Sequence, residues 1–234
     1  MSKPRTPAFQ TDEHKHPNKT NFFEDEEKSP SAVTYAKVKQ ILEIDRLNNN
    51  DSTLLSIIVT NKSLKNRVLT KEEKNLFFSA LSQNTIVKNL TLNYLKFDED
   101  DILNLVKALK SRNIELESLF IQGTDISIKS AKALSTVPVN ILSLRLSRIG
   151  DDAALSFVEK TSMVKEVDFS GANLSAPGLL KIINTNAATH KLDKASIATA
   201  FDGFVCTEEQ RKSLRSKLDE MEKPGISNNL NIKR

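Results

Sequence analysis

Residues 87–97 read VKNLTLNYLKF, and the spacing of apolar residues in this stretch decides the fold. Val87 is followed by apolar residues three, five and ten positions later, and four other segments repeat this spacing. The five sets are Leu54, Ile57, Val59, Leu64; Val87, Leu90, Leu92, Phe97; Leu116, Leu119, Ile121, Ile126; Val139, Leu142, Leu144, Ile149; and Val164, Val167, Phe169, Leu174. Consecutive sets begin 33, 29, 23 and 25 residues apart, a period typical of solenoids that place one strand and one helix in each unit.

Helix-start signals follow each apolar set. Thr70 and Glu73 form a capping box, and Asp98 and Ser127 stand at the N-cap positions of the next two predicted helices. Gly150 makes a turn into a fourth helix, and Pro177 lies near the start of a fifth, where its missing N–H does no harm. The sequence therefore predicts a helix after every strand, with the third helix shorter than its neighbours.

This pattern resembles leucine-rich-repeat proteins over Leu54 to Ala188, and it is nearest the ribonuclease-inhibitor type, which has a full helix in each repeat. The resemblance implies an α/β solenoid, a short horseshoe with parallel strands on the concave face and helices on the convex face. The family usually places Asn, Cys or Thr two residues before the last apolar position. Here that place holds Lys62, Leu95, Thr124, Ser147 and Ala172, so we expect an incomplete ladder of side-chain hydrogen bonds.

The composition divides the chain into five parts. Residues 1–32 lack Leu, Ile and Val and hold four of the seven prolines, so we expect a disordered tail. We expect a capping helix over residues 33–50, repeats with a degenerate last unit over 51–205, a second capping helix over 206–223 and a flexible tail over 224–234. The apolar runs are too short for a membrane span, so none is expected.

Chemistry-bearing residues are sparse. His14 and His16 lie in the predicted tail with no further metal ligand nearby, and Cys206 has no histidine placed to activate it. The acidic run over residues 98–101 coincides with a helix start, where carboxylates act as caps, although the same run offers ligands for a divalent cation. We expect no catalytic residue, metal or cofactor, and so no enzyme.

The predicted strands instead offer a binding surface, because alternate residues of each strand face away from the core. We expect a protein partner to bind on the concave face through Asn93, Tyr94, Phe120, Gln122, Arg145 and Asp168. Phe120 is the most informative of these, since a solvent-facing phenyl ring needs a cover. The alternatives for Phe120 are that a loop or tail covers it, or that the predicted register is off by one.

A last signal lies at the C-terminus, where Asp219, Glu220 and Glu222 form an acidic cluster ahead of a polar tail with Ile232. This is similar to the export signals of type IV secreted bacterial effectors. The resemblance implies a virulence protein that is secreted into the host cytoplasm without a signal peptide; otherwise we expect a cytoplasmic protein.

The leading hypothesis is thus a monomeric, non-catalytic protein–protein interaction module. The alternatives are a nucleic-acid-binding repeat protein and an enzyme whose site is hidden in the sequence. The net charge of +4 and the pI near 9.0 favour the first alternative weakly, because basic residues are interleaved with acidic ones rather than clustered.

Overall fold

The computed structural model describes residues 34–159, 161–189, 194–196, 207–209, 212, 216 and 230–231. The chain divides into two units, Met1–Pro30 and Ser31–Arg234, and all described residues belong to the second. The disordered tail predicted over residues 1–32 and most of the capping helix predicted over 206–223 lie outside the described residues.

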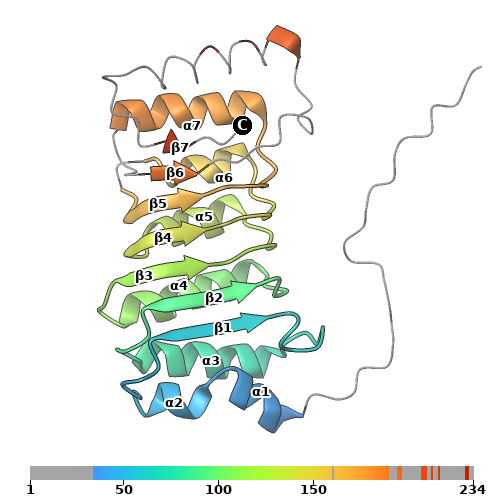
Figure 1. Ribbon diagram of the computed structural model, residues 1–234, viewed down its shortest axis with the longest axis vertical. Coiled ribbons are helices and arrows are strands. Elements are labelled where there is room, and N and C mark those ends of the chain that lie inside the picture. Colours follow the sequence, from blue (N-terminus) through green and yellow to red (C-terminus); the bar gives the residue numbers. More distant parts are fainter. Residues whose placement is uncertain are drawn as a thin grey trace, which may run out of the picture. The chain divides into compact units, whose positions relative to one another are not determined.

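The second unit is an α/β fold in which parallel strands alternate with helices. The described strands form one parallel sheet whose spatial order is the chain order, β1 to β7 (Figure 1). The strands are β1 (Ser56–Thr60), β2 (Asn89–Asn93), β3 (Leu116–Phe120), β4 (Val139–Ser143), β5 (Val164–Asp168), β6 (Lys194–Ser196) and β7 (Leu230–Asn231). Each crossover between neighbouring strands up to β5 therefore contains one helix, as the repeat spacing predicts.

The helices pack in sequence order on one side of the sheet, each against the next (Figure 1). They are α1 (Tyr35–Ile41), α2 (Ile44–Asn48), α3 (Lys71–Gln83), α4 (Glu99–Ser111), α5 (Ile128–Ser135), α6 (Asp151–Leu155) and α7 (Ala176–Thr189). The short α5 agrees with the prediction for the third repeat helix, and α6 is shorter still. The shorter helices belong to the repeats with the shorter period.

The predicted register is confirmed. All twenty residues of the five apolar sets are buried, each with 6% or less of its surface exposed. The second member of each set is paired with the second member of the next, from Ile57 through Leu90, Leu119 and Leu142 to Val167. Because side chains alternate along a strand, this row faces the helices and the residues between its members face the other way.

The predicted helix caps are also present. The Thr70 hydroxyl accepts a hydrogen bond from the Glu73 N–H at 3.3 Å, and the Glu73 carboxylate accepts from the Thr70 N–H at 2.9 Å. Asp98 and Asp101 make the same reciprocal pair at α4, and Ser127 caps α5. These bonds satisfy N–H groups that the first turn of a helix leaves without intrahelical partners, and so fix where each helix begins.

The single capping helix predicted over residues 33–50 is wrong in one respect, because the segment forms two helices. Glu43 has a left-handed backbone (φ 54°) and separates α1 from α2. Leu42 and Ile44 flank this break and are each only 1% exposed. Residues two apart in one helix point about 200° apart, so a continuous helix would not bury both.

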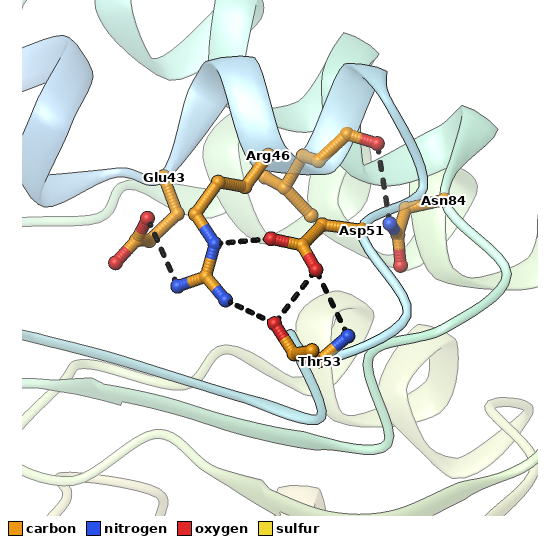
Figure 2. A network of polar contacts seen from close by, with 6 residues as sticks. Glu43, Arg46, Asp51, Thr53 and Asn84 are labelled. Atoms are coloured by element: carbon orange, nitrogen blue, oxygen red, sulfur yellow. Dashed lines mark hydrogen bonds and ion pairs between the residues drawn. The ribbon is translucent and has the colours of Figure 1, made fainter.

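A polar network joins α2 to the segment that leads into β1, as Figure 2 shows. Arg46 donates to the Asp51 carboxylate at 2.7 Å and to the Thr53 hydroxyl at 3.0 Å. The hydrogen bonds from Thr53 and then from Arg46 lower the pKa of Asp51 from its ordinary 3.8 to about 2. Asn84, at the end of α3, donates to the Leu47 carbonyl at 3.2 Å and so ties α2 to the first repeat.

The tail predicted over residues 224–234 is described only at Leu230 and Asn231. Leu230 and Asn231 form β7, which pairs in parallel with Ala195 and Ser196 of β6. The pairing satisfies backbone N–H and C=O groups of β6 that would otherwise lie unpaired at the edge of the sheet. This gain explains why a polar segment can pair there. No described helix has the length and apolarity required to cross a membrane.

The expected side-chain ladder in the loops is present at one position. The Ser147 hydroxyl donates to the Ile121 carbonyl at 3.0 Å and accepts from the Thr124 N–H at 3.3 Å. The Thr124 hydroxyl oxygen is buried and has no hydrogen-bond partner. Leu95 and Ala172, at the equivalent places, have no side-chain polar group to continue the ladder.

Candidate partner-binding face

The sheet has a second face, turned away from the helices, that consists of the residues between the buried positions. The parallel register aligns these residues in two rows across β1 to β5. The row nearer the strand starts is Ser56, Asn89, Ser118, Ile141 and Glu166. The row nearer the strand ends is Ile58, Thr91, Phe120, Ser143 and Asp168. We call these rows, together with Asn93, Tyr94, Gln122 and Arg145 at the carboxyl ends of the strands, the strand face.

The structure brings the six residues predicted for partner binding onto adjacent strands of this face. Phe120 is paired with Ser143, which is paired in turn with Asp168. The Ser143 hydroxyl lies 3.5 Å from the Asp168 carboxylate, at the limit of a hydrogen bond, and 3.4 Å from the side-chain nitrogen of Gln122. The Asp168 carboxylate also accepts from the Ser170 N–H at 2.9 Å.

The other predicted residues lie at the strand ends. The Asn93 side chain accepts from the Gln122 N–H at 3.3 Å, and the Tyr94 N–H donates to the Gln122 carbonyl at 2.7 Å. The Arg145 carbonyl accepts from the Gly123 N–H at 3.2 Å. Backbone hydrogen bonds therefore hold these residues in place, and their side chains project from a rigid frame.

The strand face carries apolar side chains at solvent-exposed positions, which are usually polar in a protein that binds no partner. Ile58 is 66% exposed and Ile141 is 39% exposed, and Phe120 is half-buried between its neighbours. The predicted register is not off by one at Phe120, because Leu119 and Ile121 on either side are fully buried. Exposed apolar side chains grouped on one face are typical of a binding surface.

The charges of the strand face are sparse and incompletely paired. Arg145 is exposed, and it makes no ion pair with any carboxylate among the described residues. Outside the strand face, near the strand starts, Lys88 lies 3.5 Å from Glu117, and both side chains are about half exposed. Exposed pairs of this kind contribute little to stability, so these groups are free to exchange partners at low cost.

The sequence prediction missed Leu146, which belongs to a series of left-handed residues in the turns after β2 to β5. The series is Tyr94 (φ 56°), Gly123 (66°), Leu146 (56°) and Gly171 (70°), and each occupies the same place in its repeat. A non-glycine residue in this conformation costs about 1 kcal/mol. Aligning the five apolar sets places these four residues in one column, so the alternation of a bulky residue with glycine was visible in the sequence.

Other candidate sites have structural roles. Asp98 and Asp101 cap α4, and Asp101 forms an ion pair with Lys74. Glu99 accepts hydrogen bonds from Ser127 at 2.6 Å and from Lys129 at 2.9 Å, and these bonds lower its pKa. Three of the four carboxylates of the acidic run, those of Asp98, Glu99 and Asp101, are therefore engaged within the protein, which confirms the capping interpretation of Asp98.

The remaining candidates, His14, His16 and Cys206, lie outside the described residues. Among the described residues, no group of three or more His, Cys, Asp and Glu side chains is arranged to hold a metal ion.

Comparison with known proteins identifies no family. No protein-family model and no curated protein matches the sequence. Solved structures that match include the actin-binding site 2 (ABS2) of leiomodin-1, at 18% identity and a TM-score of 0.40 over 81% of this chain and 93% of that one. They also include the C-terminal domain of Caenorhabditis elegans tropomodulin, at 13% identity and a TM-score of 0.38 over 80% of this chain and 99% of that one. Agreement at this level identifies neither a family nor a partner for this chain.

Proposed function

We propose that the protein is a non-catalytic interaction module that binds a partner protein on the strand face. The observation that carries this proposal is the presence on one face of the exposed Ile58, Ile141 and Tyr94 and the half-buried Phe120, together with Arg145, which makes no ion pair among the described residues. Tyr and Arg are enriched among the residues that dominate binding energy, and apolar neighbours exclude water from them.

The physical basis is the rigidity of the face. Its side chains project from paired strands whose opposite face is fully packed, so little conformational entropy is lost when a partner binds. Asn93 and Gln122 are half-buried, and their side chains make only long hydrogen bonds within the chain, at 3.3 and 3.4 Å. A partner can therefore form hydrogen bonds with them around the apolar contacts without first breaking strong ones, and the second oxygen of Asp168 has only the contact of 3.5 Å with Ser143.

The test is affinity capture with the full-length chain followed by mass spectrometry. The variant Phe120→Ala with Arg145→Ala removes an apolar and a charged group from the strand face. The matched control, Ile128→Ala with Lys107→Ala, removes an exposed apolar residue and an exposed cation from the helices. We expect the strand-face variant to lose partners that the control retains; equal recovery by both variants contradicts the proposal.

A second arm deletes residues 1–32. Partners that survive the deletion but not the strand-face substitutions bind the repeats, and partners that the deletion removes bind through the N-terminal segment. We expect the principal partner to survive the deletion.

Two finer proposals accompany the binding role. We propose that the array is a short leucine-rich-repeat horseshoe of the ribonuclease-inhibitor-like type with helical caps and a concave strand face, which the one-strand, one-helix repeat supports. Small-angle scattering of residues 34–234 tests it, and a straight rod contradicts it. We also propose a monomer, which the same measurement tests through the molecular mass.

Delivery into a host cell as a bacterial effector remains a separate proposal, and the acidic cluster that motivates it lies outside the described residues. A translocation reporter fused to the chain tests it. We expect transfer to be lost when Asp219, Glu220 and Glu222 are replaced by Asn and Gln; unchanged transfer, or none with the natural cluster, contradicts the proposal.

Nucleic-acid binding is the weaker candidate, although Arg145, Lys62 and Lys96 make no ion pair among the described residues. Several cations are paired with carboxylates: Arg46 with Asp51, Arg67 with Glu73, Lys74 with Asp101, Lys129 with Glu99 and Arg148 with Asp125. The strand face carries Asp168 and Glu166 as well as Arg145. The basic residues therefore do not form the continuous patch that a phosphate backbone requires.

A further inference from the structure

The series of left-handed turns at the carboxyl ends of the strands contains two exposed apolar side chains. Tyr94 is 47% exposed and Leu146 is 50% exposed. Each covers the glycine that follows it in the series, since a Cβ built on Gly123 would overlap the Tyr94 ring and one built on Gly171 would overlap Leu146. The two glycines thus leave room for the bulky side chains to lie across the neighbouring turn.

Packing over the neighbouring glycine explains only part of the choice of residue at these two positions. Glycine adopts the left-handed conformation without strain and does so at the two alternate turns, whereas Tyr and Leu are strained there. About half of each side chain still faces solvent after covering its glycine. The buried half of each side chain does no more than offset a backbone strain of about 1 kcal/mol, and strained residues of this kind cluster at ligand-binding sites.

We propose that Tyr94 and Leu146 are the two anchor points for an amphipathic, acidic α-helix of the partner, laid across the carboxyl ends of β2 to β4. This inference rests on the proposed function and specifies the chemistry of the partner. The anchors belong to turns that are two strands apart, which places them about 10 Å from each other. Residues i and i+7 of an α-helix lie on one face about 10.5 Å apart, which matches this spacing.

Other backbone conformations fit less well. An extended peptide places side chains of one face about 6.7 or 13 Å apart, which misses the spacing on either side. A polyproline helix repeats about every 9 Å, but it has no residue on the same face between two successive anchors. The α-helix does have such residues, at i+3 and i+4, and they lie over the intervening strand, where Gln122 stands.

The charges near the two anchors favour a helix that carries acidic residues. Arg145 precedes Leu146, and Lys96 and Lys62 lie on the loops that follow β2 and β1. None of the three makes an ion pair with a carboxylate among the described residues. The acids at this edge are already engaged, because Asp168 accepts from the Ser170 N–H and Asp125, on the loop after β3, forms an ion pair with Arg148. A helix with carboxylates beside its apolar stripe therefore finds cations along this edge.

The experiment is a selection of helical peptides on the full-length protein. A phage-displayed library on a fixed helical scaffold is enriched on the natural chain, and the enriched peptides are measured by fluorescence anisotropy. The test variant is Tyr94→Asn with Leu146→Asn, because Asn tolerates a left-handed backbone and so preserves the turns. The control is Met163→Asn, which removes a side chain of equal exposure (50%) at the opposite, amino end of a strand.

We expect the enriched peptides to carry apolar residues at i and i+7 with Asp or Glu between them, and to bind the test variant about tenfold more weakly than the control. Peptides that bind the test variant and the control equally, proline-rich peptides, or no enrichment overturn the inference.

The captured partner separates this inference from the proposed function. If Tyr94→Asn with Leu146→Asn retains a partner that Phe120→Ala with Arg145→Ala loses, the strand-face function stands and the helix inference fails. If both double variants retain the partner, both proposals fail.

Discussion

The alternation of side chains in β3 makes a quantitative prediction, because Leu119 and Phe120 are adjacent and face opposite ways. Leu119 is fully buried, and Phe120 is half-buried on the strand face. Leu119→Ala removes three carbon atoms from the core, worth about 2.4 kcal/mol at about 0.8 kcal/mol for each buried methylene. The cavity that remains adds to this loss, so we expect a cost of about 3 kcal/mol.

Phe120→Ala removes a larger side chain from a partly solvated position, so we expect it to cost only about 1 kcal/mol. Equilibrium unfolding in urea, followed by far-ultraviolet circular dichroism, gives both values from the shifts in midpoint at an unchanged slope. A one-residue slip of the strand would exchange the two environments. A larger loss for Phe120→Ala than for Leu119→Ala therefore refutes the register on which the strand face rests.

Three further predictions concern the turns, the caps and the charges. Gly123→Ala should cost about 2 to 3 kcal/mol, since a methyl group there strains the left-handed backbone and displaces the Tyr94 ring, and the cost should fall to about 1 kcal/mol in a Tyr94→Ala background, where only the backbone strain remains; equal losses in the two backgrounds in thermal unfolding would mean that the ring does not pack there. Glu73→Gln should cost about 2 kcal/mol in urea unfolding, because the Glu73 side chain is only 2% exposed and its carboxylate accepts two hydrogen bonds from Arg67, at 2.8 and 2.9 Å, that the amide cannot both accept; a change below about 0.5 kcal/mol would contradict this. The lowered pKa of Asp51 stabilises the fold above its ordinary 3.8, and this contribution is lost as pH falls through about 2, so the urea midpoint of the natural chain should fall more steeply over that window than that of Asp51→Asn; parallel profiles would show that the network does not hold the carboxylate ionised.

Local patterns were sufficient to predict the repeats and the helix starts. The five apolar sets and the Thr70–Glu73 box each depend on residues within about ten positions of one another, and the structure contains all of them. The strand face follows from the same pattern, because knowing which side chains point inward fixes which point outward.

Features that depend on contacts between residues far apart in the sequence could not be predicted from local patterns. Arg112 ends α4, where a cation normally faces solvent, yet it is 3% exposed. Its guanidinium donates to the Asn84 carbonyl at 2.8 Å and to the Val87 carbonyl, so a segment 25 to 28 residues earlier in the chain supplies the partners. Burial lowers the pKa of Arg112 to about 10. The break at Glu43 and the pairing of Leu230 in β7 also depend on where neighbouring segments lie, which no local spacing records.

The candidate site was predicted in part for the same reason. Phe120, Arg145 and Asp168 follow from strand alternation alone. Leu146 does not, because it stands in a turn, where alternation ends and the backbone conformation decides the direction of the side chain. Only the comparison of equivalent turns, with glycine at Gly123 and Gly171, reveals it.

The central claim is that a partner protein contacts the strand face, and site-specific photo-crosslinking measures that contact directly. A benzophenone amino acid replaces Phe120 on the strand face in one chain and Ile128 on the helices in another, and both are irradiated with the captured partner. The account predicts a crosslinked product from position 120 and none from position 128. Crosslinking from position 128 alone, or from neither position while the partner remains bound, would contradict it.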